Sequence, residues 1–137
     1  MAETLRVGIA GLGTVGAETF RILSERKDIL LSRSGKKIEV VAVSSQDRHM
    51  DRGIDLSGVE WVDDARKLCL MPNVDVVVEL IGGAEGIAKD IAEATVKNNK
   101  YFVTANKALI AHYGDEIGKN AEKNDVSIGF EAAVAGG

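Results

Sequence analysis

Residues 5–23 read LRVGIAGLGTVGAETFRIL. The run Leu5–Ala10 is mostly apolar, which is typical of a buried parallel strand. It leads directly into the G-x-G-x-x-G motif of residues 11–16, and a helical pattern follows. A glycine motif by itself is weak evidence, but between a strand and a helix it indicates a dinucleotide-binding turn.

The three glycines of this motif have different physical roles. Gly11 permits a tight turn out of the strand, Gly13 lets the backbone approach a diphosphate, and Gly16 lets helix and strand pack closely. The diphosphate would bind the free N–H groups at the start of the helix, where the helix dipole is positive. The alternative is a glycine-rich turn without a ligand. The candidate cofactor-binding residues here are Gly11, Leu12, Gly13, Thr14, Val15 and Gly16.

The composition is that of one globular domain. The chain has 137 residues, of which 45% are hydrophobic and 28% are charged, and this length is sufficient for a single core. The net charge of −4 argues against nonspecific nucleic-acid binding. The single cysteine, Cys69, excludes an internal disulfide. We find no signal-like start and no apolar run of about 18 residues, so we expect a cytoplasmic protein without a membrane span.

Strand-like runs alternate with helical stripes along the rest of the chain. Alternation of this kind predicts an α/β fold with a doubly wound parallel sheet (Rossmann), about six strands in the order 3-2-1-4-5-6, in a three-layer αβα arrangement. The first helix should carry Val15, Thr19, Ile22 and Leu23 on one face, and residues 65–71 should form a short helix ended by Pro72. The other expected strands are Ile38–Val43, Trp61–Val62, Val74–Ile81, Tyr101–Thr104 and Val126–Phe130.

The residues after the second strand bear on cofactor choice. In this fold an Asp or Glu at that point commonly hydrogen-bonds the 2′-hydroxyl of the adenosine ribose. Here Ser44 and Ser45 take its place, and Arg48 follows. Two hydroxyls and a guanidinium suit a 2′-phosphate, so we favour NADP over NAD. Alternatively, Asp47 folds back and restores the contact that NAD needs.

The end of the fourth expected strand should also line the cofactor cleft. Ligands of open α/β sheets lie beyond the carboxyl ends of the strands, which places Ile81, Gly82 and Gly83 there. Glu79 is unusual inside such an apolar run. We favour a hydrogen-bonded buried acid over a catalytic one.

Four stretches together resemble the nucleotide-binding domain of homoserine dehydrogenase. They are AGLGTVG (10–16), VELIGG (78–83), VTANKALIA (103–111) and FEAAVAGG (130–137). The resemblance extends from Leu5 to the last residue, although residues 48–71 contribute little. The TANK and EAAVAGG segments are more specific than the glycine loop.

This resemblance implies reduction of aspartate 4-semialdehyde to homoserine with NAD(P)H, on the route to threonine and methionine. It implies a catalytic position for Lys107 at the cofactor and substrate end of the cleft, with Thr104 and Asn106 beside the cofactor. From the residues alone, Lys107 could equally be a surface lysine at a helix start. The resemblance also implies a monovalent cation, usually sodium, bound by Glu131, Val134 and Gly136.

Members of that family continue past the equivalent of Gly137 into a substrate and dimerisation domain. We therefore expect residues 1–137 to be the NAD(P)-binding domain of a longer, homo-oligomeric enzyme, and expect the fragment alone to be inactive. The alternatives are another amino-acid semialdehyde reductase and a non-catalytic NAD(P)-sensing domain. Cys69 is poorly placed to act as the nucleophile of an aldehyde-oxidising enzyme.

Overall fold

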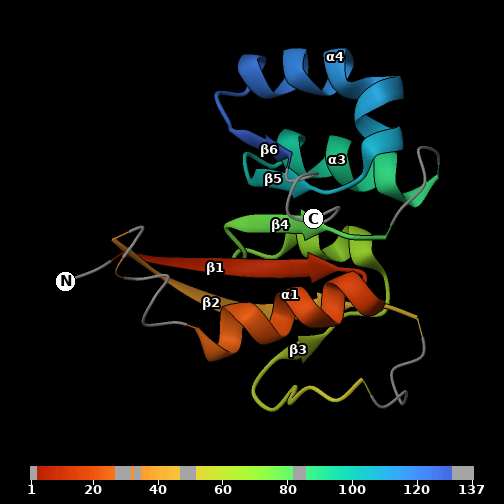
Figure 1. Ribbon diagram of the computed structural model, residues 1–137. Coiled ribbons are helices and arrows are strands. Elements are labelled where there is room, and N and C mark those ends of the chain that lie inside the picture. Colours follow the sequence, from red (N-terminus) through yellow and green to blue (C-terminus); the bar gives the residue numbers. More distant parts are fainter. Residues whose placement is uncertain (1–2, 27–31, 33–34, 47–51, 82–85, 131–137) are drawn as a thin grey trace.

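The computed structural model describes residues 3–26, 32, 35–46, 52–81 and 86–130. The described part of the chain forms a parallel sheet with helices on both faces (Figure 1). Its strands are β1 (Glu3–Ala10), β2 (Lys36–Ser44), β3 (Glu60–Trp61), β4 (Val76–Glu79), β5 (Tyr101–Thr104) and β6 (Ile128–Phe130). Its helices are α1 (Thr14–Glu25), the 3-10 helix η1 (Ala65–Leu70), α3 (Ile87–Lys97) and α4 (Lys107–Lys123).

The strand order is β3-β2-β1-β4-β5-β6, and every neighbouring pair is parallel. This confirms the doubly wound fold predicted from the alternating pattern. The order reverses between β1 and β4, where Ala10 pairs with Glu79. Ligands of such sheets bind outside the carboxyl ends of the strands at this switch point.

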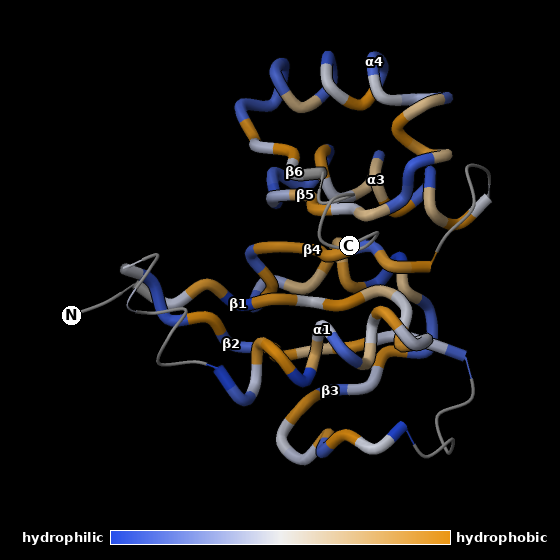
Figure 2. The backbone as a smooth tube through the Cα atoms, in the orientation of Figure 1, coloured by the Kyte–Doolittle hydropathy of each residue, from blue (hydrophilic) through white to orange (hydrophobic). Residues whose placement is uncertain are grey.

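Helices cover the two faces of the sheet unequally. On one face, Phe20 and Leu23 of α1 pack against Val7, Ile9 and Val43. On the other face, η1, α3 and α4 enclose a larger core that includes Val77 and Phe102. Figure 1 shows α1 lying across β1 and β2, whereas α3 and α4 lie with β5 and β6. In Figure 2, the tube of β4 is apolar along most of its length, as expected for a central parallel strand.

The predicted stripe on α1 exists, but most of it is not core. Val15, Thr19, Ile22 and Leu23 do share one side of the helix, because all four line one groove. However, Val15 is 45% exposed and Ile22 is 40% exposed. The residues that α1 buries most deeply are Gly16 and Phe20.

Of the other predicted strands, β5 has the predicted bounds, and the rest are present with shifted ends. β2 begins at Lys36 because Lys36 and Lys37 pair with the first residues of β1. β4 covers only the middle of the predicted run 74–81. The short helix before Pro72 is a 3-10 helix, in which the Asp64 side chain accepts a hydrogen bond from the N–H of Arg66. None of the described helices is long and apolar enough to cross a membrane.

Candidate functional site

The glycine loop joins β1 to α1 at the carboxyl edge of the sheet. Gly11 has a φ of +102°, a conformation that L-residues with side chains rarely adopt. Its N–H donates to the carbonyl of Ser44 at 2.7 Å. A Cβ at Gly11 would lie 3.0 Å from the backbone nitrogen of Ile81. The tight turn and the close approach of the β4 exit therefore both require glycine at this position.

The site of Gly16 is crowded, whereas the site of Gly13 is open. A Cβ at Gly16 would lie 1.9 Å from the carbonyl oxygen of Gly11, so the loop and the helix can pack only around a glycine. Apart from its chain neighbours, no described residue places an atom within 4 Å of a Cβ at Gly13. The absence of a side chain at Gly13 thus leaves open space at the start of α1, where a ligand backbone can approach.

The start of α1 offers hydrogen-bond donors to an anion. The first intrahelical bond runs from the N–H of Ala17 to the carbonyl of Gly13 at 2.9 Å. The N–H groups of Thr14, Val15 and Gly16 precede that bond and have no partner within the helix. Within the described part of the chain, no side chain caps α1 and its first turn holds no acid. Such an end is suited to a phosphate.

The two serines after β2 lie beside this loop. The hydroxyl oxygen of Ser45 accepts a hydrogen bond from the N–H of Leu12 at 3.0 Å, so Ser45 helps to hold the glycine loop. Ser44 is only 3% exposed. Both serines line a cavity of about 420 Å³ at the carboxyl edge of the sheet. The same cavity is lined by Gly11, Gly13, Gln46, Asp63, Ala65, Leu80, Ile81 and Ile87.

Arg52 also reaches the glycine loop, which the sequence did not indicate. Its Nε donates to the carbonyl of Leu12 at 3.1 Å, and its Nη2 donates to the carbonyl of Gln46. The guanidinium lies 5.4 Å from the centre of the Trp61 ring, a cation–π distance. Arg52 therefore connects the loop after β1 with the residues after β2. Residues 49–64 show only a weak pattern, and no local signal pairs Arg52 with a residue 40 positions earlier.

The start of α4 presents the predicted lysine at the same edge of the sheet. Asn106 caps the helix, because its Oδ1 accepts a hydrogen bond from the N–H of Leu109 at 3.0 Å. Lys107 is the first residue of α4 and is exposed. Its side chain makes no ion pair with any residue that the structure describes. Thr104, in contrast, is fully buried, and it lines an apolar groove beside α1.

Several predicted site residues lie outside the described residues. They are Arg48, Gly82, Gly83, and the predicted cation ligands Glu131, Val134 and Gly136, together with Asp47. Among the residues that are described, no group of three or more His, Cys, Asp or Glu side chains could hold a metal ion.

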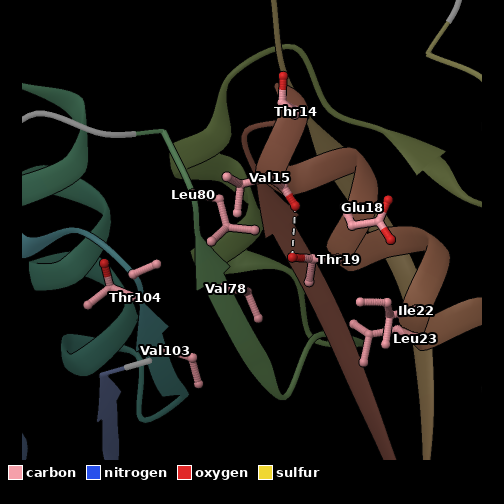
Figure 3. Close-up of a pocket in the computed structure, with 11 residues that line it drawn as sticks. Thr14, Val15, Glu18, Thr19, Ile22, Leu23, Val78, Leu80, Val103 and Thr104 are labelled. Carbon is pink, nitrogen blue, oxygen red and sulfur yellow. Dashed lines mark hydrogen bonds between the residues drawn. The ribbon is translucent and has the colours of Figure 1, made fainter. Parts of the chain in front are cut away.

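A second cavity, an apolar groove of about 450 Å³, lies between α1 and the ends of β4 and β5 (Figure 3). Val15 and Ile22 form its wall on α1, and Val78, Leu80 and Val103 form its wall on the sheet. The lining is almost entirely apolar, so this groove does not suit a diphosphate. The cavity beside Gly13 is the more polar of the two, and this polar cavity is the better candidate for the cofactor.

Comparison with known sequences settles the family. A family model described as "Homoserine dehydrogenase, NAD binding domain" matches residues 11–131. The chain belongs to this family. It is 41% identical to the homoserine dehydrogenase of Pseudomonas aeruginosa over 135 residues, and this alignment covers 98% of the chain and 30% of the relative. The enzyme of Neisseria gonorrhoeae is 42% identical over the same length, with 31% of the relative covered.

Solved structures of the family agree with the fold. A homoserine dehydrogenase from Thiobacillus denitrificans superposes with a TM-score of 0.87 at 35% identity, covering 96% of this chain and 30% of that one. The enzyme from S. aureus gives a TM-score of 0.86 at 29% identity, covering 98% of this chain and 33% of that one. The sequence thus spans about a third of its relatives' length, and that third is their NAD-binding domain.

Proposed function

We propose that residues 1–137 are the cofactor-binding domain of a homoserine dehydrogenase that reduces aspartate 4-semialdehyde to homoserine. In the full-length protein, this domain would be followed by a substrate and dimerisation domain of the kind implied by the family resemblance. The observation that carries the proposal is the glycine loop with its uncapped helix, in a chain 41% identical to a named homoserine dehydrogenase. The pathway role in threonine and methionine synthesis follows from the same reaction.

The described residues fit a nicotinamide dinucleotide. Space is open at Gly13, and the N–H groups at the start of α1 can bind the diphosphate. The adenosine end would occupy the polar cavity beside Ser45, and Lys107 would meet the nicotinamide or substrate end. When bound, the reduced nicotinamide supplies the hydride that reduces the aldehyde. By the same resemblance, a lysine of the substrate domain would donate the proton, so the 137 residues alone should bind cofactor without turning substrate over.

We further propose that the cofactor is NADP rather than NAD. The two described residues at the end of β2, Ser44 and Ser45, carry no charge that would repel a 2′-phosphate. Arg48 would supply the charge-assisted contacts. NAD is the alternative, and one observation favours it: the carboxyl-bearing residue Asp63 lines the same cavity and could accept a hydrogen bond from a ribose hydroxyl.

Three further features belong to the same proposal. A monovalent cation, sodium by resemblance, would bind oxygens of Glu131, Val134 and Gly136, and assays with sodium replaced by a larger organic cation would test this. The full-length protein would be a homo-oligomer. A cytoplasmic location is in keeping with Cys69, a free cysteine buried in the core.

The deciding experiment is a spectrophotometric assay of the full-length protein. Oxidation of NADPH or NADH should depend on aspartate 4-semialdehyde, and the reverse reaction should depend on homoserine. Other amino-acid semialdehydes, tested in parallel, would identify a related reductase. A full-length protein that binds the dinucleotide but reduces no aldehyde would instead be a sensor, and the proposed activity would be wrong.

A further inference from the structure

Glu79 is a fully buried acid at the point where three strands end. It is the last residue of β4 and has no exposed surface. In the sheet its partners are Ala10, the last residue of β1, and Thr104, the last residue of β5. A carboxyl group in such a position is costly unless it is hydrogen-bonded.

Both carboxylate oxygens of Glu79 accept hydrogen bonds. Oε1 accepts from the backbone N–H of Ile81 at 2.7 Å, and Oε2 accepts from the hydroxyl of Thr104 at 2.7 Å. The Thr104 oxygen in turn accepts from the backbone N–H of Asn106 at 2.9 Å. One buried side chain therefore holds the first turn after β4 and, through Thr104, the turn after β5.

The two turns held in this way are the ones that face the cofactor. Ile81 lines the polar cavity, and its nitrogen lies close to Gly11 of the glycine loop. Asn106 caps α4 and immediately precedes Lys107. A shift of either turn would change the distance between the β4 exit and Lys107.

We propose that Glu79 is a positioning residue that fixes the nicotinamide end of the cleft. Its carboxylate holds the β4 exit at Ile81 and, through the Thr104 hydroxyl, the start of α4 that carries Lys107. Glu79 is buried behind these turns and does not itself touch substrate. This inference rests on the proposed function, since it assumes that a nicotinamide ring binds beside Lys107.

A carboxylate suits this task better than an amide. It is an acceptor on both oxygens, and among the described residues each oxygen meets a donor, Ile81 N–H and the Thr104 hydroxyl. In a Glu79→Gln variant the amide oxygen can still accept from Ile81, but the amide nitrogen would face the Thr104 hydroxyl, which then loses its acceptor. Thr104→Val removes the same link from the other side with nearly the same side-chain shape. Thr104→Ser keeps the hydroxyl.

The test compares binding of two probes to the full-length protein. One is the reduced cofactor, and the other is the matching ADP-ribose, which lacks the nicotinamide ring. Thr104→Val and Glu79→Gln should each weaken binding of the reduced cofactor by about tenfold or more, because the turns proposed to face the nicotinamide end are no longer held in place. Both variants should have a lower kcat. Their affinity for ADP-ribose should stay within about threefold of the parent's. Thr104→Ser should recover most of the loss.

Thr95→Val is the matched control. Thr95 is also fully buried, and its hydroxyl donates to the carbonyl of Ile91 at 2.6 Å within α3, away from the cleft. It should lower the melting temperature without changing the ratio of the two affinities.

Equal weakening of both probes, or parent-like kcat and cofactor affinity in Thr104→Val, would overturn the positioning role. If Glu79→Gln does not fold, the comparison of Thr104→Val with Thr104→Ser still tests the positioning role. A parent protein that reduces no semialdehyde would refute the proposed function, whereas the comparison of the two probes would still test Glu79.

Discussion

The carbonyl oxygen of Gly11 lies 1.9 Å from the position that a Cβ would occupy at Gly16. Real atoms do not approach so closely, and the obstructing atom is backbone, so even a methyl group forces the loop and helix apart. This contact makes the helix entry dependent on glycine for packing, independently of any ligand.

Gly16→Ala should therefore destabilise the protein, by about 1–3 kcal/mol or more, as overpacked sites do. Thermal unfolding followed by circular dichroism measures this. Gly118→Ala is the control, because Gly118 lies in α4 and a Cβ there would meet no atom of the described residues within 4 Å beyond the backbone of its own helix. That change should be neutral or stabilising by about 0.5–1 kcal/mol. Equal stability of the two variants would show that the loop adapts freely.

Gly13→Val should leave the stability of the fold nearly unchanged but impair cofactor binding. The space at Gly13 is open, so the fold should persist, but a branched side chain would stand where the diphosphate must approach. Nicotinamide cofactor titrated into the folded variant should bind at least about tenfold more weakly, a loss of about 1.4 kcal/mol. Affinity within about threefold of the parent would remove the glycine loop from the cofactor site.

How far the sequence could predict this fold depends on the kind of signal. The β-branched runs and the strand–helix alternation predicted the order of all six strands, because each buried parallel strand is a local pattern. The ends were less predictable, since β2 is extended by pairing with β1 and not by its own residues. Periodicity also placed Val15 and Ile22 on one face of α1, but it could not show that this face borders an open groove.

The site was predictable where one short segment contains it and unpredictable where it depends on distant contacts. The glycine loop follows from a local motif, whereas the prediction for Asn106 and Lys107 after β5 rests mainly on the resemblance to a family. Arg52 reaches Leu12 across 40 positions, and no local pattern indicates such a contact. Glu79 was conspicuous as an acid within an apolar run, yet its partner Thr104 lies 25 positions later.

The choice between NADP and NAD can be tested by removing one positive charge, at Arg48, and one negative charge, at Asp63. If NADP is the cofactor, Arg48→Ala should weaken NADP by about tenfold or more, because a charge-assisted contact to phosphate is worth about 1.5–3 kcal/mol, and should leave NAD nearly unchanged. Asp63→Asn should then leave NADP binding intact or improve it. Calorimetry with both cofactors makes the comparison. Equal losses for the two cofactors in Arg48→Ala, or a selective loss of NAD in Asp63→Asn, would favour NAD.

The ion pair between Arg6 and Asp75, at the amino edge of the sheet, should make the folding stability fall in acid. Hydrogen bonds from the Arg6 guanidinium, at 3.0 and 3.1 Å, hold the pKa of Asp75 below its usual value. A carboxyl with a lowered folded pKa adds stability above its unfolded pKa of about 3.9, and this stability is lost as the pH falls. Asp75→Asn should therefore lower stability near neutral pH and flatten its decline in acid. Asp115→Asn, at an exposed position in α4, is the control for removal of a carboxylate and should change stability near neutral pH by no more than about 0.5 kcal/mol.

Lys107→Met tests the residue that the proposed function places nearest the chemistry. Methionine keeps most of the apolar stem but not the charge, and the Asn106 cap remains, so α4 should persist. Turnover by the full-length protein should fall, whereas the adenosine and diphosphate contacts lie elsewhere in the cleft. ADP-ribose should thus bind about as well as before. Lys119→Met, at an exposed position further along α4, should keep the parent rate. A full rate in Lys107→Met would make Lys107 a surface residue at a helix start and remove it from the site.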